Sequence, residues 1–112
     1  MDTIKWADFE QVELRVGTIT GVHSFPQARR PAYQLVIDFG PELGSKKSSA
    51  QITELYTAKE LQGRQVVAVV NFPPKQIGTF MSECLVTGFY QKDGAVVLAV
   101  PERPVENGAK LL

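Results

Sequence analysis

The stretch Val12-Glu-Leu-Arg-Val-Gly-Thr-Ile19 decides the fold of this chain of 112 residues. From Val12 to Val16, apolar residues alternate with charged ones, as expected for a β-strand with one buried face. The alternation slips at Gly17 and resumes at Ile19, which predicts a bulge or a bend at this point. The chain therefore begins with one long, coiled strand.

Four later stretches also have strand patterns. Residues 33 to 39 carry apolar side chains at every second position, which indicates a half-buried strand. Residues 65 to 72 include five consecutive apolar residues, which suits a strand covered on both faces. Residues 82 to 90 and 95 to 100 are joined across Asp93-Gly94, a strong hairpin turn signal.

The segment between the second strand and residue 65 is less regular. The polar residues 45 to 51 form either an exposed strand or a loop, and periodicity does not decide between the two. Thr57 and Glu60 have the spacing of a capping box, and Gly63 is a natural helix terminator. This pattern predicts a helix of about two turns at most.

Five strands with a short helix after the third are the arrangement of an all-β OB-fold barrel, whose curvature needs a bulged first strand containing glycine. We expect a single domain of this type over residues 1 to 112. Residues 8 to 11 have helix-cap spacing beside Trp6 and Phe9, which predicts a short amphipathic turn that closes the barrel end. Residues 101 to 112 follow the fifth strand as a C-terminal extension.

The composition is that of an ordinary globular protein, with 44% apolar and 21% charged residues. Twelve basic and twelve acidic residues cancel, so the chain lacks the overall positive field of proteins that bind nucleic acid chiefly by electrostatics. The charge is uneven, because residues 1 to 14 hold four acids and one lysine, whereas residues 15 to 47 hold five bases and two acids. Any site for a polyanion is therefore local.

The sequence favours a cytoplasmic location. The amino-terminal residues lack the basic start and apolar core of a secretory signal peptide. Uninterrupted apolar runs such as residues 66 to 70 are far below the roughly 20 residues of a membrane helix, so we expect no membrane insertion. Cys84 is the only cysteine, which excludes an intrachain disulfide and suits a reducing compartment.

No group of residues points to catalysis, to a cofactor or to a metal site. His23 is the only histidine, and without an evident partner it is more often a surface or packing residue than a general base. Cys84 lies beside Leu85 and Val86, where an inert buried thiol is at least as strongly favoured as a nucleophile. The glycines match no phosphate-binding loop, so we expect a protein that is not an enzyme.

Two polar stretches place basic residues beside hydroxyls or amides. They are residues 44 to 52 and residues 71 to 78, the second running on to residue 85. Lysine with Ser or Asn donors suits phosphate and sugar oxygens. The alternative is that both stretches are solvated loops.

A series of motifs runs through nearly the whole chain in a fixed order: Leu14-Arg-Val-Gly-Thr-Ile19, Phe25-Pro-Gln-Ala-Arg29, Ile37-Asp-Phe-Gly40, Ser48-Ser-Ala-Gln-Ile-Thr53, Gly63-Arg-Gln-Val-Val-Ala-Val-Val-Asn-Phe-Pro-Pro74, Met81-Ser-Glu83 and Asn107-Gly108. In these motifs the chain resembles the tRNA-binding-domain family of OB-folds, and within it the CsaA-type export chaperones. The resemblance implies a homodimer that binds unfolded or precursor polypeptides and contacts the preprotein translocation machinery. It also implies a domain related to structure-specific tRNA binders.

Carried over by position, the resemblance gives a set of RNA-binding candidates: Lys46, Lys47, Ser48, Ser49, Gln51, Asn71, Lys75, Gln76 and Ser82. The apolar residues beside them are candidates for peptide binding, or alternatively belong to the barrel or dimer core: Phe72, Pro73, Pro74, Ile77, Phe80 and Met81. Two features depart from the family: relatives usually place an aliphatic residue at the position of Ser45, and dedicated tRNA binders tend to be basic.

The resemblance favours a polypeptide-binding chaperone, with a structure-specific tRNA-binding protein as the alternative and a plain structural subunit as a third possibility. Because the bases near the candidate surface are few, any tRNA binding is expected to be weak and steeply dependent on salt. Open strand edges and the apolar end Leu111-Leu112 predict a two-fold dimer.

Overall fold

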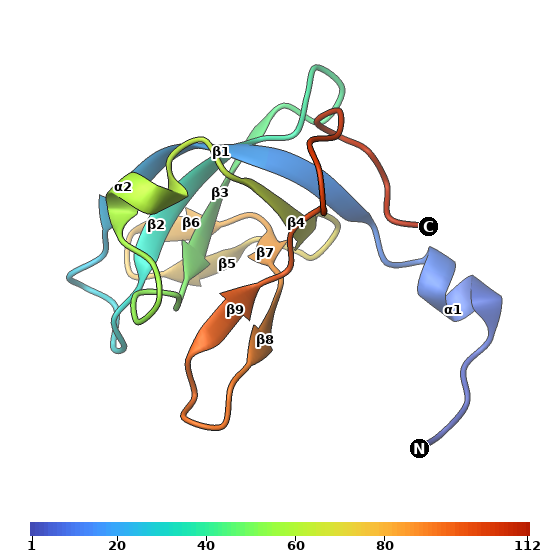
Figure 1. Cartoon of the computed structure of the whole chain (residues 1–112), viewed down its shortest axis with the longest axis horizontal. Helices are drawn as coiled ribbons and strands as arrows, with labels where there is room; N and C mark the ends of the chain where they lie inside the picture. The colour runs from blue at the N-terminus through green and yellow to red at the C-terminus, as the bar shows by residue number, and fades with distance from the viewer.

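The computed structural model describes residues 1–112 and shows a curved five-stranded antiparallel sheet that nearly closes into a barrel (Figure 1). The strand order in this sheet is β3-β2-β1-β4-β7. The bounds are β1 Leu14–Ser24, β2 Tyr33–Asp38, β3 Ser45–Ala50, β4 Gln65–Val69 and β7 Leu85–Val86. This architecture confirms the predicted OB-fold barrel, with a short helix after the third strand.

The long first strand is confirmed, but its irregularity lies elsewhere than predicted. The register between β1 and β2 shifts between Ile19 and Gly21, whereas Gly17 pairs regularly with Val66 of β4. Gly17 instead gives space to the core, because a Cβ atom there would lie only 2.6 Å from Ile37 Cγ2 and 2.7 Å from Phe39 Cδ1. The break in alternation at Gly17 therefore marks the close approach of the Ile37 and Phe39 side chains to β1, and not a bulge.

The polar residues 45 to 51, left open between strand and loop, form β3. This strand pairs with β2 over its whole length, from Asp38 opposite Ser45 to Tyr33 opposite Ala50. The sequence did not indicate this strand because its side chains are mostly polar and do not alternate with apolar ones. The strand forms through cross-strand pairing and not through a hydrophobic face of its own.

Two small hairpins extend the sheet (Figure 1). One joins β5, Lys75–Ile77, to β6, Phe80–Ser82, and the other joins β8, Gly88–Tyr90, to β9, Val96–Leu98. The predicted turn at Asp93-Gly94 is confirmed, but the single strand expected over residues 82 to 90 is divided among β6, β7 and β8. The division occurs because the chain changes partners: Thr87 N–H donates to Val67 O (3.0 Å), while Thr87 O accepts from Ala99 N–H (3.1 Å).

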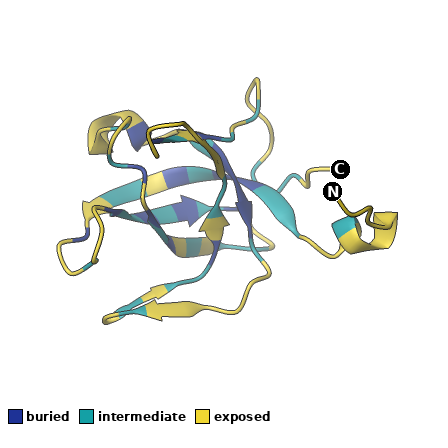
Figure 2. Ribbon diagram, turned by 90° about the horizontal axis from the view of Figure 1, so that it is seen from below, coloured by how far each residue is buried: buried dark blue, intermediate teal, exposed yellow.

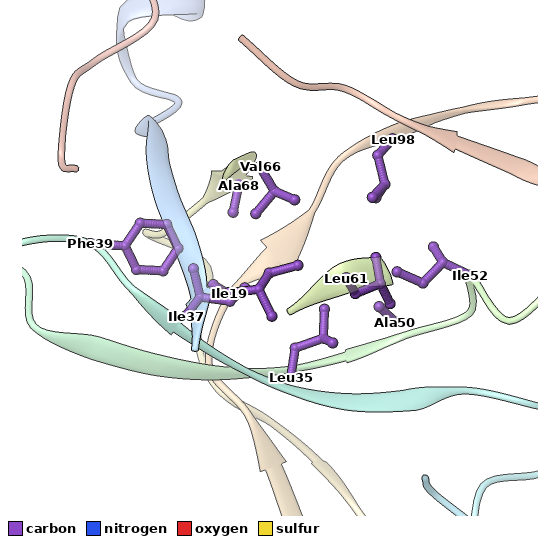
Figure 3. Packing of buried hydrophobic residues seen from close by; sticks show 11 residues of the cluster. Ile19, Leu35, Ile37, Phe39, Ala50, Ile52, Leu61, Val66, Ala68 and Leu98 are labelled. Atoms are coloured by element: carbon purple, nitrogen blue, oxygen red, sulfur yellow. The ribbon is translucent and has the colours of Figure 1, made fainter. Parts of the chain in front are cut away.

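The barrel encloses one cluster of eleven buried residues, most of which are labelled in Figure 3. The second helix, α2, spans Ala58–Leu61 and supplies the fully buried Leu61 to this cluster. Its predicted capping box is present, because Glu60 N–H donates to Thr57 Oγ1 (3.2 Å) and Thr57 N–H donates to Glu60 Oε1 (3.0 Å).

The first helix, α1, spans Trp6–Glu10 and differs from the prediction in both position and role. Its N-cap is Lys5, three residues before the expected cap at Asp8, and Lys5 N–H donates to Asp8 Oδ2 (2.9 Å). It stands away from the barrel and contains no buried residue (Figures 1 and 2). The Trp6 and Phe9 rings lie 5.6 Å apart and contact each other, and the Trp6 side chain is 64% exposed. In this chain α1 therefore does not close the barrel end.

The C-terminal extension runs beside the first half of β1. Val16 N–H donates to Ala109 O (3.0 Å), Gly108 N–H donates to Val16 O (2.7 Å) and Leu111 N–H donates to Leu14 O (2.9 Å). The Arg15 guanidinium also donates to Gly108 O (2.9 Å) and to Glu13 Oε1 (2.7 Å). The extension thus covers the part of β1 that β2 does not reach. None of the helices has the length and apolar character that crossing a membrane requires.

Candidate binding surface

The candidate residues gather where β3 meets the segment after β6, a junction that we call the seam and define by residues 47 to 49 and 82 to 84. Across it, Lys47 N–H donates to Glu83 Oε1 (2.9 Å) and Glu83 N–H donates to Lys47 O (2.7 Å). Ser49 N–H donates to Ser82 Oγ (3.0 Å). Side chains thus take part in most of the bonds that complete the barrel here.

Successive side chains of β3 point to opposite faces, which separates the RNA-binding candidates. Ser48 is fully buried, and its hydroxyl donates to Cys84 O (3.0 Å). Its side chain is therefore part of the core and has no free surface for a ligand, contrary to the expectation. Lys47 is exposed, and Ser49 beside it is half-buried.

The β5–β6 hairpin divides the peptide-binding candidates in the same way. Ile77 pairs with Phe80, and both side chains are half-buried. The Phe80 ring lies 5.3 Å from the ring of buried Phe25, and Lys47 Nζ lies 5.4 Å from the Phe80 ring centre. For Phe80, the alternative that it is a packing residue therefore agrees with its position.

The remaining apolar candidates face solvent. Phe72 is 54% exposed and leads into the exposed Pro73 and Pro74, while Met81 is 37% exposed. Met81 pairs with Gln76, and both are exposed, so they occupy the face of the hairpin opposite to Phe80. Four of the six peptide-binding candidates are thus available to a ligand.

Three polar candidates lie away from the seam or already have partners. Asn71 accepts from Glu13 N–H (3.0 Å) and donates to Gln11 O (2.7 Å), so both ends of its amide hold the segment after α1. Gln76 donates to Gly78 O (3.0 Å) within its own hairpin turn. Gln51 lines a separate cavity of about 290 Å³. The structure therefore does not bring all nine RNA-binding candidates together.

The charge at the seam is modest. Lys47 and Ser49 lie beside Ser82, and Lys75 pairs with Ser82 across the hairpin, but Glu83 adds a carboxylate to the same place. Burial raises the pKa of the Cys84 thiol to about 11, although Ser48 opposes the shift, so this thiol is protonated at neutral pH. That value agrees with the interpretation of Cys84 as an inert buried thiol.

Two features of the surface were not predicted from the sequence. One is the cavity around Gln51, whose lining includes Arg30 and Val96. The other is the exposure of apolar side chains on β7 and β8, where Leu85 is 50%, Phe89 65% and Tyr90 85% exposed. The strand pattern of residues 82 to 90 was visible in the sequence, but nothing in it indicated which residues lack a partner.

The chain is similar to a known family and to solved structures of chaperones. The family model for a putative tRNA-binding domain matches residues 14–110. The crystal structure of the chaperone CsaA from Bacillus anthracis has 49% sequence identity and a TM-score of 0.93, covering 99% of this chain and 100% of that one. The CsaA chaperone structure from Picrophilus torridus has 47% identity and a TM-score of 0.92, covering 98% and 100%.

A curated relative has the same domain within a longer protein. The methionine–tRNA ligase of Archaeoglobus fulgidus is 29% identical over 110 residues, which are 98% of this chain. The chain spans only 16% of the length of that ligase. Since the family match covers most of the barrel and both CsaA structures match over their whole length, this chain belongs to the tRNA-binding-domain family, as a CsaA-type member.

Proposed function

We propose that this protein is a molecular chaperone that binds unfolded or precursor polypeptides and assists their export. The observation that carries the proposal is the exposed apolar group Phe72, Pro73, Pro74 and Met81 beside the seam. Apolar residues that stay exposed together are typical of surfaces that bind other macromolecules. The similarity to CsaA chaperone structures over their full length supports the same function.

The proposal includes the setting in which the chaperone acts. The chain forms one domain, works as a homodimer in the cytoplasm, and hands its clients to the preprotein translocation machinery. It catalyses no reaction, in keeping with a family defined by tRNA binding and not by catalysis.

A second function, binding of structured tRNA, is supported by the family match and by Lys47, Ser49 and Lys75 around Ser82. Lys46 and the exposed Arg29 are further candidates for phosphate contacts, whereas Arg30 lines the separate cavity around Gln51. Each neutralised phosphate adds about 0.7 to 0.9 to the slope of log affinity against log salt, so four contacts give a slope of roughly three. We expect weak binding that is lost as salt is raised.

Paired binding assays separate the two functions. Phe72→Ser is the variant of choice for the apolar group, because Phe72 is more exposed than Phe80, which packs on Phe25. We expect Phe72→Ser to weaken binding of an unfolded model polypeptide and to leave tRNA binding unchanged. The double variant Lys46→Glu and Lys47→Glu is expected to do the opposite.

Salt provides a second distinction. Apolar burial contributes about 25 cal/mol per Å² and survives added salt, whereas phosphate contacts do not. If Phe72→Ser remains folded and suppresses client aggregation as well as the wild type, the apolar group is not the client site. If the wild type binds tRNA but no unfolded polypeptide, tRNA binding is the function.

A further inference from the structure

Most strand edges in this fold are covered. The C-terminal extension pairs with the first half of β1, and the seam occupies the outer edge of β3. On the outer side of β9, Leu98 N–H donates to the Tyr56 hydroxyl (3.0 Å). The outer strand of the other hairpin, β5, begins with Lys75 directly after Pro73-Pro74, and lysine and proline are residues that discourage pairing at an edge.

The outer edge of β8 has no such protection. Gln91 N–H donates to Ala95 O (2.7 Å) and Ala99 N–H donates to Thr87 O (3.1 Å), and the two strands stay in register between these bonds. Hydrogen-bonded pairs alternate along an antiparallel ladder, so Phe89 and Val97 form the bonded pair. The N–H and C=O groups of Gly88 and Tyr90 therefore point away from β9 and toward solvent.

The side chains around this edge are apolar and uncharged. Phe89 is 65% exposed and Val97, opposite it on β9, is 37% exposed. Leu85, which precedes β8 on the same stretch of chain, is 50% exposed. Gly88 lets β8 lie close against β9, because a Cβ atom there would be 2.5 Å from Val96 Cγ1 and 2.8 Å from Val97 O. Figure 2 shows the hairpin projecting from the barrel with most of its surface exposed.

We propose that β8 binds an extended segment of the client polypeptide as an additional β-strand. Main-chain groups of the client would bond to Gly88 and Tyr90, which gives affinity without a requirement for sequence, and apolar client side chains would contact Phe89, Val97 and Leu85. This inference rests on the proposed chaperone function and specifies how the client is held. A second copy of the chain is a poorer occupant, because three residues of β8 cannot bury the roughly 800 Å² per partner of a stable interface.

A peptide that cannot form the ladder tests the inference. The probe is a short unstructured peptide of alternating valine and serine, compared with the same peptide N-methylated at four consecutive central residues. Because methylation removes the donors on both edges of the peptide, we expect at least about a tenfold loss of affinity for the wild-type protein. Equal binding of both peptides would overturn the inference while leaving the chaperone function intact, and failure to bind either peptide would overturn both.

Amide hydrogen exchange identifies the strand. With saturating peptide, exchange at the Gly88 and Tyr90 amides is expected to slow at least about tenfold, while the Phe89 amide, already bonded to β9, serves as the internal control. Tyr90→Pro removes an outward N–H and should lose peptide binding, whereas Tyr90→Ala keeps the N–H and should retain most of it. Unchanged exchange at both amides, or slowing caused by tRNA and not by peptide, would overturn the inference.

Discussion

Ser48 illustrates how the same residue type can serve the core or the surface. It lies in a polar stretch, yet it is fully buried and donates to Cys84 O across the seam. From sequence its hydroxyl was as plausible a ligand contact as that of Ser49, because only the pairing of β3 with β2 decides which side chains face inward. This information is absent from a run without apolar alternation.

Replacing Ser48 with Ala should destabilise the protein without affecting tRNA binding. The change removes the closer of the two hydroxyl donors to the buried Cys84 O and leaves only Ser82 Oγ at 3.5 Å, so we expect a cost of about 1 kcal/mol. Urea unfolding measures the cost, and the exposed Ser45→Ala variant, expected within about 0.5 kcal/mol of wild type, is the control. A stable Ser48→Ala protein that no longer binds tRNA would contradict the assignment of Ser48 to the core.

Glu13 should make stability depend on pH. Hydrogen bonds from Arg15 and then Lys110 hold the pKa of Glu13 below its ordinary value of 4.5. A carboxylate with a lowered folded-state pKa stabilises the fold above its unfolded pKa, and that contribution is lost as pH falls through the folded one. Glu13→Gln should therefore lose less stability than wild type as the pH falls below about 4.5.

Thermal midpoints between acidic and neutral pH check this expectation. Glu10→Gln is the matched control, because Glu10 is exposed and has no ion pair. Part of the fall in thermal midpoint at acidic pH will persist in Glu13→Gln, since hydrogen bonds from Thr57 also lower the pKa of Glu60 in the cap of α2. Equal acid slopes in wild type and Glu13→Gln would show that the ion pairs of Glu13 contribute nothing in solution.

At the level of elements, the sequence predicted strands well where they have a buried face. The strands β1, β2 and β4 and the cap of α2 followed from alternation, apolar runs and capping-box spacing. The division of residues 82 to 90 did not, because it depends on β4, a partner distant in sequence. The β5–β6 hairpin is a local pairing, but its strands have only three residues each, which is too short for a period to show in the sequence. The exposure of α1 was likewise missed, since an amphipathic pattern does not identify the surface it packs on.

Replacement by alanine should have opposite effects on stability at the two glycines Gly17 and Gly21 of β1. In Gly17→Ala the new Cβ would lie 2.6 Å from Ile37 Cγ2, so overpacking should cost about 1–3 kcal/mol. In Gly21→Ala the nearest atoms belong to Val36 at 3.5 Å, an ordinary contact, so the change should be neutral or stabilising by up to about 1 kcal/mol. Chemical unfolding of both variants checks the difference, and equal stabilities would mean that the core yields easily at Gly17.

The whole molecule leaves apolar side chains exposed at both ends of the chain. Near the N-terminus, Ile4 is 72% and Trp6 64% exposed, and at the C-terminus Leu112 is 94% exposed. A second copy that covers α1 and the last residues would give these side chains a partner, which is the basis for the proposed homodimer.

Sedimentation at micromolar concentration should therefore give twice the 12.4 kDa of one chain. The double variant Ile4→Ser and Trp6→Ser should shift the equilibrium toward monomer, because it removes apolar surface without touching the barrel core. Leu55→Ser, another exposed apolar residue, is the control and should leave the mass unchanged. A wild-type mass of one chain would refute the dimer.

The pairing of the C-terminal extension with β1 also governs how the protein matures during its own synthesis. Arg15 and Gly108, which it brings together, are separated by 93 positions in the chain. At about 5–20 residues per second, the ribosome takes about 5 to 20 seconds to make the residues between them. Throughout that interval the nascent first strand has an open edge, so the barrel is complete only after residues 108 to 111 have left the ribosome.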